Sequence, residues 1–155
     1  MISKWDIRFL RLADHISTWS KDPHKKVGCV IVDNFKRVVS VGYNGFPTGV
    51  SDAESRYNDR NVKRLYVAHA EQNALDNRVS SVRGHTLYCQ FYPCNECAKS
   101  IISSGISRVV TTVPIMDSPA DRFHWRESIL MFTESGVQVD TVEQDQIAVD
   151  SFEES

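Results

Sequence analysis

The sequence lacks a long apolar run, an excess of basic residues and a signal-like N-terminus, and each absence excludes a class of protein. No apolar stretch approaches the roughly 20 residues of a membrane-spanning helix, and residues 1–6 are too polar for a signal-peptide core. The net charge of −2 disfavours a basic face for polynucleotides. We therefore expect a cytoplasmic protein (in the host cytoplasm if the source is viral) with a small-molecule substrate, and no nucleic-acid or membrane partner.

Cysteine is scarce, with four residues in a chain of 155. Cys29 and Cys89 lie in runs rich in β-branched and aromatic residues, which predicts small buried side chains. A disulfide between these two is possible but not required. Cys94 and Cys97 have the close spacing of metal ligands. Thiolate ligands suit a reducing compartment, which again favours the cytosol.

Length and composition indicate one ordinary globular domain. The 155 residues suffice for one core but not for two comfortable ones, and 41% are hydrophobic while 25% are charged. We expect a single domain over residues 1–142 and an acidic C-terminal tail over residues 143–155. No internal repeat or low-complexity tract is present.

The strongest chemical signal is His69-Ala70-Glu71 followed by Pro93-Cys94-Asn95-Glu96-Cys97. His69, Cys94 and Cys97 are zinc-type ligands, and three protein ligands leave one tetrahedral position open, as in catalytic sites. Zinc lowers the pKa of a bound water to about 7, and Glu71 is free to take its proton. A structural zinc would need a fourth close ligand. The nearest spare residues, His85 and Cys89, fall in or beside an apolar strand pattern.

Periodicity and turn signals predict alternating helices and strands. Helices are expected over residues 5–19, from about 69 to 77, over 94–104 and over 123–134. Strands are expected over residues 27–32, 38–43, 86–92, 108–113 and 137–142. Residues 50–64 are polar without a period and are expected to form a surface loop. The order predicts an α/β fold of three layers, α-β-α, with a five-stranded mixed sheet and helices on both faces.

The two ligand segments open two of the expected helices. His69 and Glu71 would lie in the first turn of one helix, and Cys94 and Cys97 at the start of another. Free backbone N–H groups and the positive end of the helix dipole favour thiolates there. We expect both helix N-termini to meet at one edge of the sheet.

The chain resembles the dCMP deaminases of the cytidine deaminase superfamily over about residues 5–142. His69-x-Glu71 with Pro93-Cys94-x-x-Cys97 matches the signature of zinc-dependent nucleobase deaminases. Narrower matches are segments 20–23 with 27–28, Gly42-Tyr43-Asn44-Gly45 with Pro47 and Gly49, Asn73-Ala74 after the first ligand, and 93–99 with 101–102 and 105–106.

The resemblance implies a cytidine-deaminase-like fold, a Zn²⁺ cofactor and hydrolysis of dCMP to dUMP and ammonia, which supplies dUMP for thymidylate synthesis. His69, Cys94 and Cys97 would hold the zinc. Glu71 would carry protons from water to the cytosine ring and then to the departing amine.

The resemblance also implies substrate contacts. Asn44 would contact the sugar, and Ala70 lies between two site residues and is expected to border the substrate. Candidates for the 5′-phosphate are His24 and Arg122, followed by Lys25 and Arg126. The alternative for all four is a solvated surface charge.

The same family is commonly a homo-hexamer that dCTP activates and dTTP inhibits, with Mg²⁺ as a possible companion of the nucleotides. Effector binding is expected at the loop from Gly42 to Gly49, through Gly42, Tyr43, Gly45 and Gly49. The region 50–64 is short beside relatives with a longer insertion, so regulation can differ. We find no further cysteine cluster for a second, structural zinc.

Two other functions compete with this interpretation. A tRNA adenosine deaminase would share the zinc site but would want a basic RNA-binding face, which the charge balance disfavours. A zinc-bearing interaction module without catalysis would not need Glu71, which is present.

Overall fold

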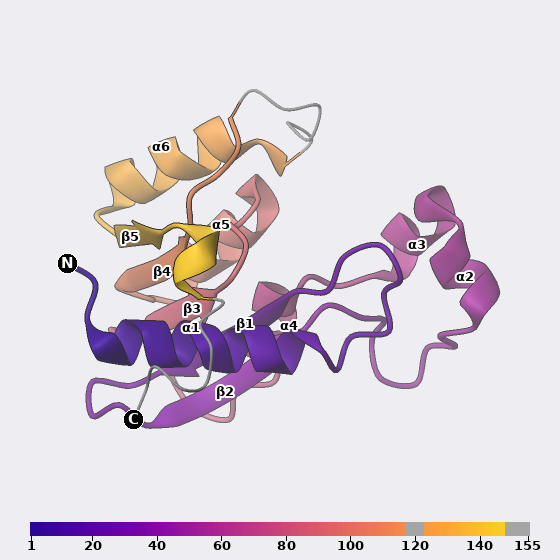
Figure 1. Ribbon diagram of the computed structural model, residues 1–155, viewed down its shortest axis with the longest axis horizontal. Coiled ribbons are helices and arrows are strands. Elements are labelled where there is room, and N and C mark those ends of the chain that lie inside the picture. Colours follow the sequence, from indigo (N-terminus) through magenta and orange to yellow (C-terminus); the bar gives the residue numbers. More distant parts are fainter. Residues whose placement is uncertain (117–122, 148–155) are drawn as a thin grey trace.

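The computed structural model describes residues 1–116 and 123–147, and these form alternating helices and strands (Figure 1). The helices are α1 (Lys4–Ser17), α2 (Glu54–Asn58), α3 (Arg60–Tyr66), α4 (Ala70–Asp76), α5 (Asn95–Ser103) and α6 (Trp125–Ser135). The strands are β1 (Gly28–Val32), β2 (Val38–Tyr43), β3 (Thr86–Cys89), β4 (Arg108–Thr112) and β5 (Gln138–Val142). In this part of the chain, no helix is both long and apolar enough to cross a bilayer.

The five strands form one mixed sheet in the order β2-β1-β3-β4-β5, which confirms the predicted fold class. Strand β1 pairs antiparallel with β2 and with β3, while β3, β4 and β5 run parallel. Cys29 lies directly opposite Cys89 in this register. Both are free and fully buried, as predicted for small core side chains.

Helices cover both faces of the sheet and create two apolar cores. Helix α1 packs on β1 and β3, where the core includes Leu10, Val30 and Val110. Helices α4 and α5 lie over the other face, with α6 packed beside α5 (Figure 1). Gly28 permits the close approach of α1, because a Cβ atom there would lie 1.9 Å from the Ala13 carbonyl oxygen.

The capping signal of α1 explains its start. The Ser3 hydroxyl accepts a hydrogen bond from the Asp6 backbone N–H at 3.2 Å, and the Asp6 carboxylate accepts one from the Ser3 N–H at 2.8 Å. The helix ends at Ser17, two residues before the predicted end. Trp19, the last residue of the expected helix, therefore lies beyond it and is 51% exposed.

The expectation of a surface loop over residues 50–64 was wrong, because α2 and α3 occupy most of this region. The Asp59 carboxylate caps α3 by accepting from the N–H groups of the next two helical residues. Phe46 stacks on Tyr57 with ring centroids 4.3 Å apart and packs against Tyr66 at 5.6 Å. Phe46 and Tyr66 lie outside residues 50–64, so periodicity within that region could not reveal these contacts.

Ordered packing continues past the last strand. Residues Gln144–Gln146 form a 3-10 turn, and Ile147 is only 3% exposed in the core beneath α1. The Arg11 side chain donates to the Ile147 carbonyl oxygen at 3.2 Å. The part of the expected tail up to residue 147 therefore packs on the same domain, and the rest lies outside the described residues.

Candidate active site

The three side chains selected as zinc ligands converge in the structure. The Nδ1 atom of His69 lies 3.5 Å from the Cys94 sulfur and 3.3 Å from the Cys97 sulfur. All three ligand atoms lie within 4.8 Å of one another. Zinc bonds of about 2.3 Å to sulfur and about 2.05 Å to nitrogen, at a tetrahedral angle, require sulfur–nitrogen separations of about 3.6 Å. The three side chains therefore form a zinc site.

This site has room for a non-protein ligand. Among the residues that the structure describes, no other His, Cys, Asp or Glu joins the group of three. A tetrahedral ion held by three side chains keeps its fourth position open, which is the arrangement of catalytic zinc.

Two helix N-termini place the ligands. His69 is the residue that precedes α4 and Cys94 the one that precedes α5, both with extended backbone angles. Cys97 lies in the first turn of α5, and its N–H donates to the Cys94 sulfur at 3.5 Å. The indole of Trp125 donates to the Tyr92 carbonyl oxygen at 3.0 Å, which fixes the approach to α5. The predicted meeting of the two helix starts is therefore present.

The electrostatics of the site favour a thiolate at Cys94, the residue that precedes α5. A hydrogen bond from the Cys97 side chain, together with the nearby His69, lowers the pKa of the Cys94 thiol to about 4. The thiolate is the form of cysteine that binds zinc.

Glu71 lies beside the ligands without joining them. Its side chain belongs to the first turn of α4 and is only 4% exposed. Burial raises the pKa of Glu71 above its ordinary value, despite the opposing effect of His69. A carboxyl group with a raised pKa suits repeated proton uptake and release near neutral pH.

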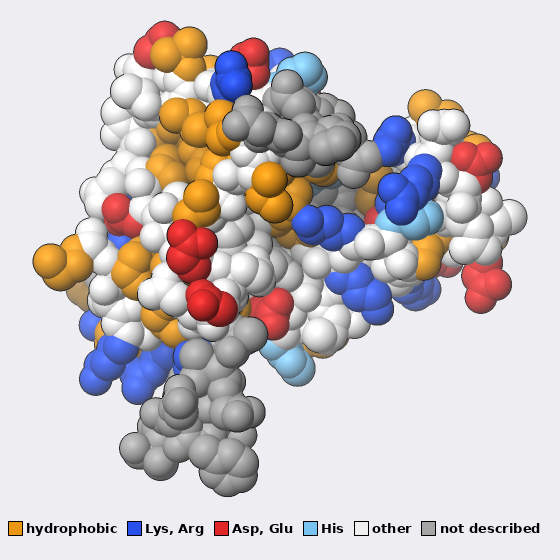
Figure 2. Space-filling view, turned by 45° about the horizontal axis from the view of Figure 1, so that its top comes forward, with side chains coloured by type: hydrophobic (Ala, Val, Ile, Leu, Met, Phe, Trp, Pro, Cys, Tyr) orange, Lys and Arg blue, Asp and Glu red, His pale blue; other side chains and the backbone are white. Residues whose placement is uncertain are grey.

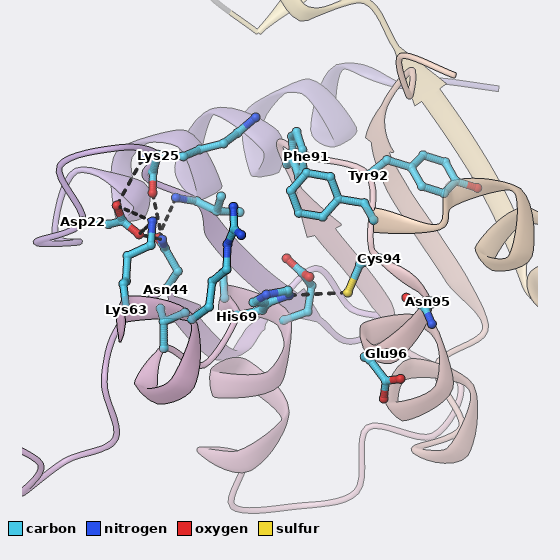
Figure 3. A pocket seen from close by; sticks show the side chains of 16 residues that line it. Asp22, Lys25, Asn44, Lys63, His69, Phe91, Tyr92, Cys94, Asn95 and Glu96 are labelled. Carbon is cyan, nitrogen blue, oxygen red and sulfur yellow. Dashed lines mark hydrogen bonds and ion pairs between the residues drawn. The ribbon is translucent and has the colours of Figure 1, made fainter. Parts of the chain in front are cut away.

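A cavity of about 280 Å³ joins these groups to the surface. Figure 3 shows His69 and Cys94 at one end of the cavity and Asp22, Lys25 and Lys63 at the other. Glu71 and Arg64 also line it. The described residues that line the cavity are Asp22, Lys25, Val27, Asn44, Lys63, Arg64, Val67, His69, Ala70, Glu71, Phe91, Tyr92, Cys94, Asn95, Glu96 and Phe123.

Two predicted substrate contacts line this cavity, Ala70 and Asn44. The Asn44 amide is engaged within the protein, because Oδ1 accepts from the Val27 N–H and Nδ2 donates to the Lys25 carbonyl oxygen, each at 2.8 Å. Asn44 therefore holds the backbone of the segment before β1, which forms part of the cavity wall.

Of the candidate phosphate-binding residues that the structure describes, only one is found to line the cavity. Lys25 lines the cavity, with its Nζ atom 3.3 Å from the centroid of the Phe91 ring. His24 and Arg126 are not among the described lining residues. The His24 Nδ1 atom lies 3.3 Å from the Lys63 Nζ atom, just behind the cavity wall. Arg122 lies outside the described residues.

The four residues assigned to effector binding have different surroundings. Gly42 is buried against α4, since an added Cβ atom would lie 2.4 Å from the Ala74 nitrogen. Tyr43 is partly exposed, and its carbonyl oxygen accepts from the Asn73 side chain at 2.8 Å. Gly45 forms a bridge with Ala68. Gly49 has a φ of +90° and open space around it.

Sequence reasoning missed the cavity residues of α3, Lys63 and Arg64, because it placed them in a loop. One signal was available. Arg60, Lys63 and Arg64 recur at helical spacing shortly before His69. It also missed the aromatic wall of Phe91 and Phe123, whose rings pack edge to face at 5.1 Å.

Comparisons with known proteins agree with this site. Residues 3–113 match the family described as the cytidine and deoxycytidylate deaminase zinc-binding region. A protein of Aliivibrio fischeri described as an uncharacterized deaminase is 40% identical over 143 residues, covering 90% of this chain and 94% of that protein. Human deoxycytidylate deaminase is 41% identical over 113 residues, covering 69% of this chain and 64% of the human protein.

A solved structure shares the whole architecture. The crystal structure of dCMP deaminase from the cyanophage S-TIM5, in complex with dCMP and dUMP, is 26% identical with a TM-score of 0.71. The alignment covers 92% of this chain and 99% of that one.

Fold and site together define a zinc-dependent deaminase, in which a His-Cys-Cys site lies beside a buried carboxyl group. The chain belongs to the cytidine and deoxycytidylate deaminase family. The resemblance stated from the sequence is thereby confirmed.

Proposed function

We propose that this protein catalyses the hydrolytic deamination of dCMP to dUMP and ammonia, and so supplies dUMP for thymidylate synthesis. The observation that carries the proposal is the His-Cys-Cys site beside buried Glu71 in a cavity with a cationic far end. Support for dCMP comes from the human relative, named deoxycytidylate deaminase, and from the cyanophage enzyme, whose complex holds dCMP and dUMP.

The protein's own residues account for the proton transfers. His69, Cys94 and Cys97 would hold the zinc, which would lower the pKa of a bound water and so supply the nucleophile. Glu71 takes one proton from this water and delivers it to N3 of the cytosine as oxygen bonds to C4. Glu71 then passes the proton of the new C4 hydroxyl to the amine, the C4–N bond breaks, and ammonia leaves. The raised pKa of Glu71 supports both steps.

We place the base against Ala70 and the apolar wall of the cavity, which includes Val27 and Phe91. The sugar is assigned to the Asn44 side. For the phosphate, His24 and Arg122 remain proposals from the family resemblance.

The test is ammonia release from a substrate panel of dCMP, dCTP, CMP, deoxycytidine and adenosine in RNA, each with the zinc-loaded protein. We expect dCMP to react far faster than deoxycytidine. Equal rates on the nucleoside would remove the phosphate requirement. Preference for adenosine in RNA would favour the tRNA deaminase alternative.

We also propose a homo-hexamer that dCTP activates and dTTP inhibits, with Mg²⁺ bound to the nucleotides, through the loop from Gly42 to Gly49. Support comes from two links between this loop and the zinc site. The Asn73 side chain of α4 donates to the Tyr43 carbonyl oxygen. Gly45 and Ala68 exchange backbone hydrogen bonds at 3.1 and 2.9 Å, one residue before His69.

Kinetics and mass measurement test the regulation. We expect a sigmoidal dependence of rate on dCMP that becomes more hyperbolic with dCTP, and light scattering is expected to give six subunits. A curve that neither triphosphate changes would identify an unregulated enzyme.

A further inference from the structure

The cationic end of the cavity is organised by a buried carboxylate. Asp22 is only 2% exposed, and its Oδ1 atom accepts from the backbone N–H groups of His24 at 2.8 Å and Lys25 at 3.3 Å. Although burial alone would raise it, these hydrogen bonds and one from Lys63 hold the pKa of Asp22 below its ordinary value. Asp22 is therefore a fixed negative charge beneath the cavity.

Lys63 forms an ion pair with this carboxylate. Its Nζ atom lies 3.0 and 3.1 Å from the two Asp22 oxygens, and its side chain is largely shielded from solvent. The contact joins α3 to the segment before β1 (Figure 3). The charges of Asp22 and Lys63 cancel locally, so this pair serves to hold α3 in place.

Arg64, the next residue on α3, is in a different situation. Its side chain lines the cavity. Within the described residues, no hydrogen bond, ion pair or ring contact engages it. Its guanidinium therefore presents donors in a fork that matches phosphate oxygens. Lys25 is a second cation that lines this cavity.

The arrangement suits a phosphate monoester, which is strongly negative. A monoester carries about −1.5 to −2 charges at neutral pH, and Arg64 offers it a guanidinium group that no described side chain engages. Arg64 and His69 are five residues apart and so at most about 18 Å from each other. Figure 2 shows Lys and Arg side chains gathered where α2 and α3 meet the body of the protein.

We propose that Arg64, together with Lys25, binds the 5′-phosphate of the substrate and makes the enzyme specific for a nucleotide over a nucleoside. In this proposal the Asp22–Lys63 pair is a positioning device that holds α3, and with it Arg64, against the cavity. The inference rests on the proposed deamination of dCMP and assigns its phosphate subsite to a helix that approaches from outside the sheet layers.

The kinetic test compares Arg64→Met with Arg60→Met, a matched control in the same helix that does not line the cavity. Arg64→Met is expected to raise KM for dCMP about tenfold to a hundredfold, the scale of charge-assisted hydrogen bonds. It is expected to leave kcat/KM for deoxycytidine unchanged. Arg64→Lys is expected to restore part of the loss, and Arg60→Met to behave as wild type. Equal KM values for dCMP in the two methionine variants would overturn the assignment.

A binding measurement separates this proposal from the proposed reaction. Calorimetric titration with dUMP and with deoxyuridine reports phosphate recognition without turnover. Wild type should bind dUMP more tightly, and Arg64→Met should lose that preference. A preference that survives in Arg64→Met, or its absence from wild type, would overturn the phosphate assignment whatever the reaction. If wild type binds dUMP through Arg64 but releases no ammonia from dCMP, the reaction is wrong and the assignment stands.

The positioning role has its own readout. Lys63→Met should raise KM for dCMP without changing kcat/KM for deoxycytidine, and Lys63→Arg should largely restore the KM. A merely structural loss would lower the rate on both substrates equally, and that result would remove the positioning role.

Discussion

The two ends of the cavity are built by different means. The zinc end rests on α4, which packs on the sheet, and on α5, which shares a core with the strands, and its ligand atoms must meet within a few tenths of an ångström. The cationic end rests on the segment before β1 and on α3, whose contacts include the packing of Phe46 against Tyr66 and the Asp22–Lys63 pair. Metal coordination requires a rigid frame, whereas long charged side chains tolerate a more lightly anchored one.

The sharpest way to test the zinc end is to remove its proton carrier. Glu71→Gln keeps the size of the side chain and all three zinc ligands, but it cannot take a proton from water. We expect kcat for dCMP to fall by about 10² to 10⁴, the usual scale of general acid–base catalysis. Ammonia release measures the loss, and metal analysis is expected to show zinc content equal to wild type.

Zinc content decides how that result is interpreted. A variant that loses both activity and zinc would show that Glu71 supports the metal site. A variant that keeps zinc and near-normal activity would contradict the proposed mechanism outright.

A second experiment asks whether Gly42 serves the zinc end or an effector. Gly42→Ala would place a Cβ atom 2.4 Å from the Ala74 nitrogen and 2.5 Å from the Ala70 carbonyl oxygen, so α4 must move. We expect a loss of about 3 kcal/mol in unfolding free energy together with reduced activity. Urea unfolding measures the first and ammonia release the second.

Gly49 provides the matched comparison. Gly49→Ala meets nothing within 4 Å, and only its φ of +90° is unfavourable, which costs about 1 kcal/mol. If the two variants lose the same stability, close packing against α4 is not the reason for glycine at position 42.

The contrast between the two ends of the cavity also explains which site residues could be predicted from the sequence and which could not. His69, Glu71, Cys94 and Cys97 were recognisable because metal chemistry restricts both residue type and spacing, and the sheet followed from alternating periodic segments. The basic residues of α3 recur at helical spacing, but its position against the cavity was not recognisable, because its anchors are single contacts between distant residues, such as Lys63 with Asp22. Long-range pairs of this kind leave no local period.

A third prediction uses a buried acid remote from the cavity, at the N-terminal end of α1 (Figure 1). Asp6 accepts hydrogen bonds from Arg108 at 2.8 and 3.0 Å and from the Tyr88 hydroxyl at 2.7 Å. Burial opposes ionisation, but these contacts and the Ser3 N–H lower the pKa of Asp6 from 3.8 to about 2. A lowered pKa means that Asp6 stabilises the fold fully above about pH 4 and loses this effect towards pH 2.

The variant Asp6→Asn is therefore expected to lose about 2 kcal/mol of unfolding free energy at neutral pH and little at pH 2. Urea unfolding of both proteins between pH 2 and 6 measures the difference. KM for dCMP should not change, because Asp6 does not line the cavity. A stability difference that is constant with pH would show that the charge of Asp6 is not the cause.

The smallest expected effect concerns how the cationic end is preorganised. The Lys25 Nζ atom lies 3.3 Å from the centre of the Phe91 ring, a contact that contributes about 0.5–1 kcal/mol. An ammonium group over a ring keeps N–H donors on its other side, so Phe91 can hold Lys25 in place while a phosphate binds. Phe91→Leu keeps an apolar wall but removes the ring face. We therefore expect KM for dCMP to rise about twofold to fivefold relative to KM for deoxycytidine, measured by steady-state kinetics. A fall in this ratio would instead mean that the ring competes with the phosphate for Lys25.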